Sequence, residues 1–399
     1  MLIEGSRPTK RPVRSPKWLW TLGAVLFGVI VTAIVLLATH WPFTEKAITQ
    51  ALEAASGRPV QIRTFSKTYF PLGCIAEGIR FLRHKHPAEP PIITVEKLVV
   101  QGSIAGMLTS PKRLSVVRVV GMRMVIPPKT PDEAPAMVPL NSGPGGKALA
   151  ISKITADGVM LEFLPEDRGK KSYLLKIDRL GITGVGSGTR MSYRATLTNS
   201  EPPGAIQTEG KFGPWNPNDV GATPVSGSFT YDDIDLGIFK SISGTGHARG
   251  QFSGPLARVQ THGSIDVGAF HVDGSDHSVQ LATTFDATVN GTNGDVSLTP
   301  LVASFRDTRI EVRGSVAGHE GGKGKTADFD VAVPKGRVDD LLYLFTKDEP
   351  GMSGDVTVNG KFLWPPGPRE FLEKIRLDLA FGWVPAGSRI PIRRTALTT

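Results

Sequence analysis

Two glycine-rich stretches carry residue types that could bind phosphate or a nucleotide. The stretch GHEGGKGKT, which starts at Gly318, resembles a phosphate-binding loop, but the first glycine of that motif would have to stand at His319. It also lies between two alternating segments, which predicts a hairpin turn and not the strand-to-helix loop that holds phosphate. GTGHARG (Gly244–Gly250) lacks the dinucleotide-binding spacing. The sequence therefore predicts neither site.

Residues that ligate metals or activate a nucleophile are few and scattered. His84 and His86 could share a strand face, but the chain has no H-E-x-x-H motif and no cysteine besides Cys74. No G-x-S-x-G motif occurs. The carboxylates within residues 232–235 precede an expected short helix, where capping explains them. A glycosidase-type carboxylate pair stays open as an alternative, although no pair stands out. We predict no catalytic residues, no metal site, no cofactor and no enzyme.

The formal charge of +9 is concentrated at the N-terminus. Residues 1–17 contain five Lys or Arg residues and one Glu, a net of +4, so the other 382 residues share the remaining +5. A nucleic-acid-binding surface would cluster basic residues on one face with aromatic residues between them, and no such stripe occurs. We expect no nucleic acid partner, and we interpret residues 1–17 as a cytoplasmic basic tail.

An uncharged apolar segment follows at residues 18–39. Its 22 residues would form a helix of about 33 Å, enough to cross a hydrocarbon core of ~30 Å. The basic residues before it predict a cytoplasmic N-terminus, with the bulk of the chain on the other side of the membrane. A cleaved signal peptide is the alternative, but its apolar region would be shorter, and the bulky His40 and Trp41 stand where small residues are needed. We predict an uncleaved membrane anchor that includes Trp18, Trp20, Leu26, Phe27, Ile30, Ile34 and Leu37.

A short amphipathic helix is expected over residues 43–56. Its apolar stripe includes Phe43, Ile48 and Leu52, while Thr44 can cap its start and Gly57 can end it. Because so short a helix is marginal alone in water, its stripe has to cover apolar surface. We expect it to cap the exposed end of an elongated sheet.

From residue 60 onward, apolar and polar residues alternate with a period of two. This alternation is typical of antiparallel strands with one apolar and one solvated face. Two arrangements stay open: the apolar face forms a groove, or it closes on itself as the core of a sandwich or barrel. The residues predicted to lie on a lipid-binding groove face are Met191, Tyr193, Leu197, Val279, Leu281, Phe285, Val289, Ile310, Val312, Phe329 and Val331.

A glycine recurs two residues before an apolar residue inside these strands. Glycine inside a strand marks bends, bulges or close backbone approach. With few helical interruptions, mainly DIDLGIFKSI and RVDDLLYLF, the pattern predicts a mostly β fold, an elongated, curved antiparallel sheet with a few short helices. The glycines are Gly210, Gly227, Gly250, Gly263, Gly314 and Gly360.

The composition divides the chain after the anchor. Residues 40–126 form an expected N-terminal module, consisting of the capping helix and strands. Residues 127–147 are rich in Pro and Gly and predict a linker. Residues 148–382 form the repeating β body. Residues 383–399 lose the alternation, and we hypothesise that this tail is truncated or frame-shifted.

On these segments the chain resembles the AsmA family of bacterial envelope proteins. The likeness rests on the anchor, then ITQALEAASGRPVQI, FPLGCIAEGIRF, VEKLVVQGSIAGMLTSPKRL and, in the body, FDATVNGTNGDVSLTP, and it covers roughly residues 15–382. The helix–GRPV segment is its most specific part. The resemblance implies a bacterial inner-membrane protein whose periplasmic part, which includes residues 40–126, forms a long, twisted β-groove lined with apolar side chains. It also implies no catalytic residues, and a contribution to outer-membrane biogenesis and phospholipid movement.

The alternation leads to a similar expectation without the resemblance. One alternating sheet has an apolar face that needs cover, and few helical segments are available to supply it. Each strand adds about 4.8 Å, so 16–18 strands would give a groove on the order of 80 Å long. We expect phospholipids and the inner membrane as partners. The alternative is a non-transporting, membrane-anchored scaffold that closes its apolar faces within itself, and a third reading, an envelope hydrolase, would need polar side chains converging in a pocket.

Overall fold

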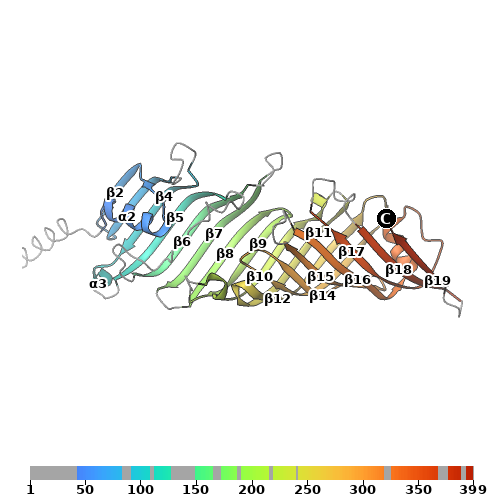
Figure 1. The fold of residues 1–399 in the computed structure, drawn as a ribbon. Coiled ribbons are helices and arrows are strands. Elements are labelled where there is room, and N and C mark those ends of the chain that lie inside the picture. The colour runs from blue at the N-terminus through green and yellow to red at the C-terminus, as the bar shows by residue number, and fades with distance from the viewer. Residues whose placement is uncertain are drawn as a thin grey trace, which may run out of the picture.

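One continuous β-sheet of 19 strands makes up most of the described chain (Figure 1). The computed structural model describes residues 43–82, 91–107, 112–126, 149–164, 172–186, 190–214, 219–239, 241–318, 325–366, 376–387 and 392–398. The helices are α2 (Glu45–Ser56), α3 (Ile104–Met107) and α4 (Val338–Phe345), and single 3₁₀ turns are η1 (Val220–Ala222), η2 (Leu236–Phe239) and η3 (Leu256–Arg258).

The strands follow the sequence in order along the sheet. They are β1 (Val60–Gln61), β2 (Thr64–Thr68), β3 (Gly73–Phe81), β4 (Ile93–Gly102), β5 (Lys112–Ile126), β6 (Leu149–Phe163), β7 (Tyr173–Val185), β8 (Met191–Ser200), β9 (Pro203–Phe212), β10 (Pro224–Asp235), β11 (Ile242–Pro255), β12 (Val259–Val272), β13 (Ser278–Val289), β14 (Val296–Phe305), β15 (Thr308–Gly318), β16 (Lys325–Arg337), β17 (Gly354–Trp364), β18 (Arg376–Pro385) and β19 (Ile392–Thr398).

Neighbouring strands pair antiparallel, as predicted, with one exception that the sequence did not predict. β5 pairs with β6 in parallel, from Lys112 opposite Leu149 to Ile126 opposite Phe163. A parallel pair needs a connection that returns along the strands, and residues 127–148, which include the predicted linker, join the two. The sheet therefore continues across the predicted boundary between the N-terminal module and the β body.

The sheet is long and twisted, as Figure 1 shows by the gradual change in strand direction from the α2 end to β19. β1 and β2 both pair with the same side of β3, so the strands occupy 18 successive positions. At about 4.8 Å per strand the sheet is on the order of 80 Å long. The prediction of a mostly β, elongated and curved sheet is confirmed.

The predicted alternation is realised in the burial of successive side chains. In β13, Val279 is buried and Leu281, Phe285 and Val289 are half-buried, whereas Ser278, Gln280, Thr284 and Asp286 are exposed. Valine, threonine and aromatic residues suit this half-buried, pleated environment. Each strand therefore contributes one apolar face and one solvated face, and the apolar sides face the same way across the sheet.

Helix α2 packs on the apolar face at the N-terminal end. The Oγ1 atom of Thr44 accepts a hydrogen bond from the Ala47 N–H, and Gly57 ends the helix at a φ of 64°. Phe43 is 4% exposed, and Ile48 and Leu52 pack against the same cluster. The N-terminal core cluster consists of Phe43, Val60, Cys74, Ala76, Ile79, Phe81, Val95, Leu98, Val100, Leu114, Ile151, Val185 and Met191.

Helix α4 packs on the apolar face near the other end, over a smaller cluster. Leu344 joins Val279 and Phe305 there, with Leu281 and Ile310 packed against them. The predicted helix in RVDDLLYLF is therefore confirmed. The segment DIDLGIFKSI is different: β10 runs through Asp235, and only the single turn η2 follows, with the Asp235 carboxylate accepting from the Gly237 N–H at 2.8 Å.

Several predicted features lie outside the described residues. These are the anchor at 18–39, the basic tail, the pair His84 and His86, and nearly all of the turn that resembles a phosphate loop. Within the described parts of the chain, no helix is long and apolar enough to cross a membrane. β18 continues past residue 382, the predicted end of the β body, to Pro385, and β19 pairs with it from Ile392 opposite Trp383. Part of the tail therefore adds a strand to the sheet, and the truncation hypothesis stays a prediction.

Candidate functional site: an apolar face and its hollow

The strand register lines up one residue from each of 17 strands into a row across the apolar face. Thr208 is the one residue of this central row that has a polar side chain. Because residues in register share a face of the sheet, the row is a nearly uninterrupted apolar surface. From β2 to β18 it contains Phe65, Ala76, Leu98, Val119, Ala156, Leu180, Ala195, Thr208, Phe229, Gly250, Gly263, Phe285, Leu301, Val312, Val331, Gly360 and Leu379.

The recurring glycines lie on this apolar face, opposite large side chains of the neighbouring strand. A Cβ atom at Gly250 would stand 2.8 Å from the Phe229 ring, and one at Gly263 would stand 2.8 Å from the Phe285 ring. Large rings that cover a glycine on the next strand are a known way of stabilising such positions. Here the missing side chains let the rings lie against the sheet, so the face is apolar without being filled.

An apolar hollow of about 610 Å³ opens on this face over β7–β13. Its size falls within the usual range of ligand pockets. Thr223 and Thr261 provide the only hydroxyl groups in its lining besides Tyr193, and Thr223 is 1% exposed. The hollow is lined by Leu180, Ile182, Tyr193, Phe212, Thr223, Val225, Phe229, Phe252, Leu256, Val259, Thr261, Phe285 and Val289.

The structure distributes the predicted groove residues over three surroundings. Tyr193, Phe285 and Val289 line the hollow. Leu197, Val312, Phe329 and Val331 lie on the same face and are half-buried. The remaining four lie elsewhere: Met191 is 4% exposed in the N-terminal core cluster, and Val279, Leu281 and Ile310 pack in the cluster under α4.

These four residues correct the prediction of one groove face. The strand period assigns a residue to a face, but it does not show where a helix covers that face. Met191 belongs to a closed core because β8 begins beside the cluster that α2 covers. Val279, Leu281 and Ile310 are covered because α4 lies over their ends of β13 and β15.

Three further rings that line the hollow were not among the predicted groove residues: Phe212, Phe229 and Phe252. The signal was present, because each stands two residues after one of the recurring glycines, in EGKF, SGSF and RGQF. Because the glycine and the aromatic residue are two positions apart in a strand, they lie on the same face of the sheet. The rings of Phe229 and Phe252 cover Gly250 and Gly227 of the adjacent strand, and sequence alone does not give this cross-strand pairing.

Tyr193 places a hydroxyl at the apolar surface. Its oxygen lies 3.3 Å from Oγ1 of Thr208, and that threonine hydroxyl donates to the Ser228 carbonyl at 2.9 Å. Burial raises the pKa of Tyr193, against a smaller lowering by the Thr208 hydrogen bond. The tyrosine is therefore neutral at physiological pH and suits an apolar ligand.

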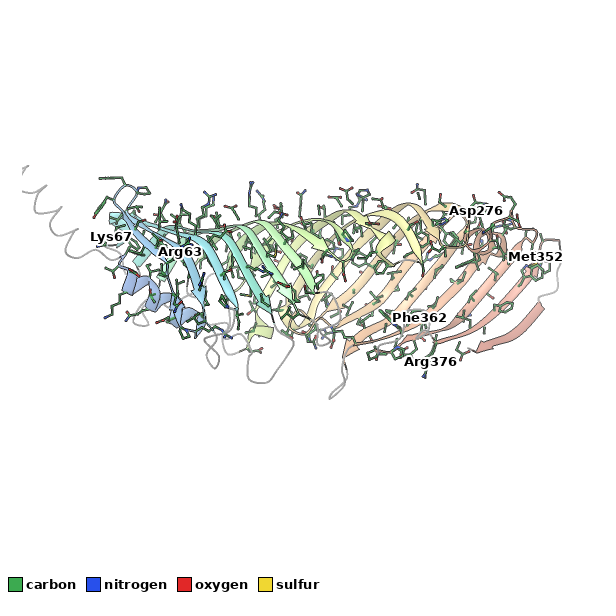
Figure 2. The ribbon with its side chains drawn as sticks, turned by 90° about the horizontal axis from the view of Figure 1, so that it is seen from above. Arg63, Lys67, Asp276, Met352, Phe362 and Arg376 are labelled. Atoms are coloured by element: carbon green, nitrogen blue, oxygen red, sulfur yellow. The ribbon has the colours of Figure 1, made fainter. Side chains whose placement is uncertain are left out.

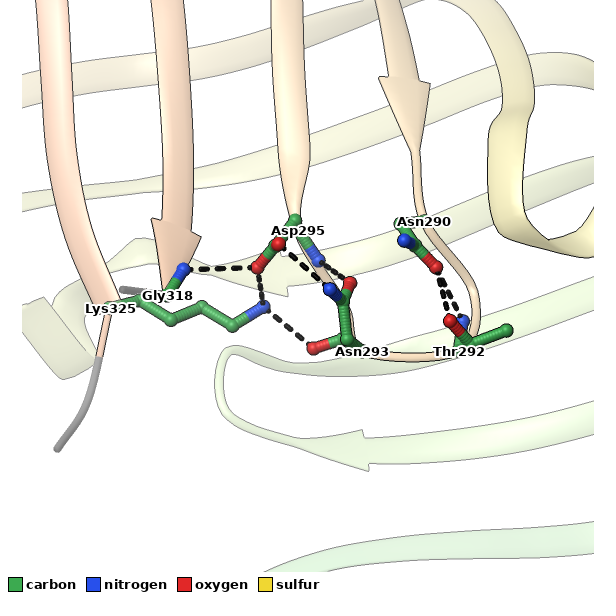
Figure 3. A network of polar contacts seen from close by, with 6 residues as sticks. All are labelled: Asn290, Thr292, Asn293, Asp295, Gly318 and Lys325. Carbon is green, nitrogen blue, oxygen red and sulfur yellow. Dashed lines mark hydrogen bonds and ion pairs between the residues drawn. The ribbon is translucent and has the colours of Figure 1, made fainter. Parts of the chain in front are cut away.

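The rim beyond Val289 is held by a polar network, which Figure 3 shows. The Lys325 ammonium lies 3.1 Å from Asp295 and donates to the Asn293 carbonyl at 2.9 Å, and the Gly318 N–H donates to Asp295 at 3.2 Å. The lysine hydrogen bond comes first among the causes that hold the pKa of Asp295 below its ordinary value. The β13–β14 turn is thereby fixed to the ends of β15 and β16.

The opposite face of the same strands is solvated and charged. Arg194 on β8 pairs with Glu209 on β9 at 2.7 Å, and Arg118 on β5 pairs with Asp157 on β6 at 2.9 Å. Within the described residues, no group of three His, Cys, Asp or Glu side chains could hold a metal ion. The charged pairs named here therefore lie on the face opposite the hollow.

No family model, curated protein or solved structure matches the chain. The resemblance to the AsmA family consequently stays a prediction, carried by the segments named in the sequence analysis. Because no known protein matches, a function for the chain has to be argued from the geometry of the apolar face.

Proposed function

We propose that the chain is a membrane-anchored periplasmic protein that holds phospholipid acyl chains on the apolar face of its sheet. The observation that carries this proposal is the apolar hollow, which is open and lined by hydrocarbon. Acyl chains have no hydrogen-bonding groups, so an apolar surface can bind them without leaving a polar group unsatisfied. The proposed role is a contribution to outer-membrane biogenesis through lipid binding or conduction.

The energetics favour a long apolar ligand. Each methylene removed from water contributes about 0.8 kcal/mol, so ten buried methylenes give about 8 kcal/mol before the cost of association. The headgroup would remain at the solvated rim, because burying its charge without a partner is costly. A hollow on a continuous apolar row also allows a chain to shift along the sheet without crossing a polar barrier.

The competing function is a scaffold that closes its apolar face within itself. The N-terminal core cluster favours it locally, since Cys74 and Ile79 are each only 1% exposed beneath α2. The middle of the sheet does not share this cover, because Phe229 and Phe285 are half-buried and line the hollow. We therefore assign the closed end to stability and the open part to binding.

The remaining parts of the proposal rest on the sequence. The segment 18–39 would anchor the chain in a bacterial inner membrane, with its N-terminus in the cytoplasm. The proposal assigns no catalytic role to any residue and requires no cofactor. Phospholipids and the membrane are its partners, and nucleic acid is not.

The experiment compares two substitutions that differ by one position in β13. Phe285→Asp places a carboxylate in the hollow, whereas Thr284→Asp places the same group on the solvated face. The full chain is extracted from membranes, transferred to amphipol, and its bound phospholipid per protein is measured by lipid extraction and native mass spectrometry. Lipid around the anchor is common to both variants.

We expect Phe285→Asp to lower the bound phospholipid and Thr284→Asp to retain the wild-type amount. Equal retention by both variants, with the fold unchanged by circular dichroism, would contradict binding in the hollow. In that case the scaffold function would be favoured.

A further inference from the structure

We infer that the tip of the β2–β3 hairpin inserts into the surface of a lipid bilayer. At this tip Phe70 is 99% exposed and Tyr69 is 58% exposed, so Phe70 is the most exposed large apolar side chain described. Neighbouring residues of the tip, Pro71 among them, are also exposed. An aromatic side chain held fully in water gains by entering the membrane interface, where Tyr and other aromatic residues concentrate.

The hairpin is located where the chain enters the described structure. Phe43, the first described residue, belongs to the same core cluster against which Phe65 and Leu72 of the hairpin pack. Both β2 and α2 lie at one end of the sheet in Figure 1. The apolar segment that ends at Thr39 is only three residues from Phe43. An anchor there would hold this end of the sheet, and therefore the tip, beside the bilayer.

Charge near the tip agrees with an anionic lipid surface. Arg63 and Lys67 are both exposed and lie at the α2 end in Figure 2. Neither forms an ion pair with a residue that the structure describes. Basic side chains beside an inserted aromatic residue are attracted to anionic headgroups. The tip thus combines the exposed aromatic side chains of Tyr69 and Phe70 with the nearby positive charge of Lys67.

Other exposed apolar residues do not share this arrangement. Phe239 is 51% exposed at the end of η2, and Phe381 is 42% exposed on β18, so each is partly shielded by its own turn or strand. They lie far along the sheet from α2 (Figure 1). They are therefore matched controls for an exposed aromatic residue that the bilayer does not reach.

The inference rests on the membrane attachment proposed above, and a fluorophore can test it in the full chain. Cysteine replaces Phe70, Tyr69, Lys67 or Phe381 singly, and each variant is labelled with the environment-sensitive dye NBD. The native Cys74 is 1% exposed, and burial raises its pKa to about 12, so it labels poorly. The protein is reconstituted into vesicles of phosphatidylethanolamine and phosphatidylglycerol, with or without nitroxide-labelled lipid.

We expect a graded response within the tip. The dye at position 70 should show the largest blue shift and the strongest quenching by lipid nitroxide, position 69 less, and position 67 least, while position 381 should remain water-like. The insertion would be overturned if the dye at position 70 were as water-like as the dye at position 381 in a chain that floats with the vesicles. That result would not affect the proposed anchor or the proposed binding in the hollow. A chain that does not float would overturn the insertion and the membrane anchor together. A protein partner for the tip would leave position 70 unquenched in these purified vesicles.

Discussion

The same apolar row has two different surroundings along the sheet. At β3 and β4 it passes through Ala76 and Leu98, which are 0% and 7% exposed under the cover of α2. At β10 and β13 it passes through Phe229 and Phe285, which are half-buried and line the hollow. The strand register is continuous between them, so the difference comes from the helix and from the side chains it meets.

The side chains differ in a way that suits each surrounding. Under α2 the row uses compact residues such as Ala76, and the helix stripe of Phe43, Ile48 and Leu52 fills the remaining space. In the open part, the rings of Phe229 and Phe285 flank Gly250 and Gly263, and none of the helices that the structure describes covers them. Close packing gives stability, whereas rings laid against glycine leave an apolar surface available to a ligand. The comparison suggests that one sheet serves both needs by changing its cover and residue size.

Thiol reactivity should show the largest difference between the two regions. Burial raises the pKa of Cys74 to about 12 from an ordinary value of 9.0, so its reactive thiolate is on the order of 10³-fold scarcer near neutral pH. A cysteine introduced by Leu301→Cys, in the open part of the row, should react with DTNB at least about 10³-fold faster than Cys74. Equal rates for the two thiols in the folded chain would show that the N-terminal region is not closed.

Truncation of core side chains should separate the regions next. Ile79 is 1% exposed, so Ile79→Ala is expected to lower the free energy of unfolding by about 2–5 kcal/mol. Leu301→Ala, at a half-buried position, should cost only about 1 kcal/mol. Urea unfolding monitored by circular dichroism measures both. A larger loss at Leu301 would reverse the assignment of closed and open regions.

The buried carboxylate of α4 should have an intermediate effect. Asp340 is 1% exposed and accepts hydrogen bonds from the Thr308 hydroxyl and the Asp307 N–H, each at 2.9 Å, while it pairs with Arg306 at 2.9 Å. Asp340→Asn presents an N–H group to these donors, and we expect a loss of about 2–3 kcal/mol.

Hydrogen exchange of the α4 amides should accelerate in Asp340→Asn more than exchange in β3. Asp328→Asn, on the solvated face of β16, is the matched control and should change neither. If both variants behave like wild type, α4 is held by its apolar contacts alone.

The pH dependence at the rim should be the smallest effect. The Lys325 hydrogen bond holds the pKa of Asp295 below its ordinary value. The group therefore stabilises the fold above the ordinary carboxyl pKa of about 3.9, and this contribution disappears as pH falls toward its lower folded-state pKa. Asp295→Asn should reduce the acid sensitivity of unfolding slightly, seen as a smaller fall in unfolding free energy below about pH 4. An unchanged acid profile would show that the network does not act on stability.

Much of the fold could be predicted from periodicity. Period-two patterns such as that of Val279–Val289 predicted strands and their apolar side, and Thr44 and Gly57 predicted the ends of α2. These are local signals, because each depends on residues a few positions apart. The parallel pairing of β5 with β6 is not local, since it depends on how a connection of 22 residues returns.

The site was predictable only in part, for the same reason. Tyr193, Phe285 and Val289 were placed correctly on the face and line the hollow. Met191 and Leu281 have the same period but lie in clusters beneath or beside a helix, and their cover comes from residues far away in sequence. The pairing of Phe229 with Gly250 depends on cross-strand register, which no single strand encodes.

The most direct test of the account is a map of lipid contact along the wild-type sheet. The full chain in its membrane is exposed to a phospholipid with a photoreactive diazirine in its acyl chain, and the labelled peptides are located by mass spectrometry. We predict labelling of the apolar residues of β8–β13, including Phe252 and Phe285, and little labelling of β3 and β4 around Ile79 and Leu98. Equal labelling of the two regions, or none in β8–β13, would contradict the division into a closed end and an open binding face.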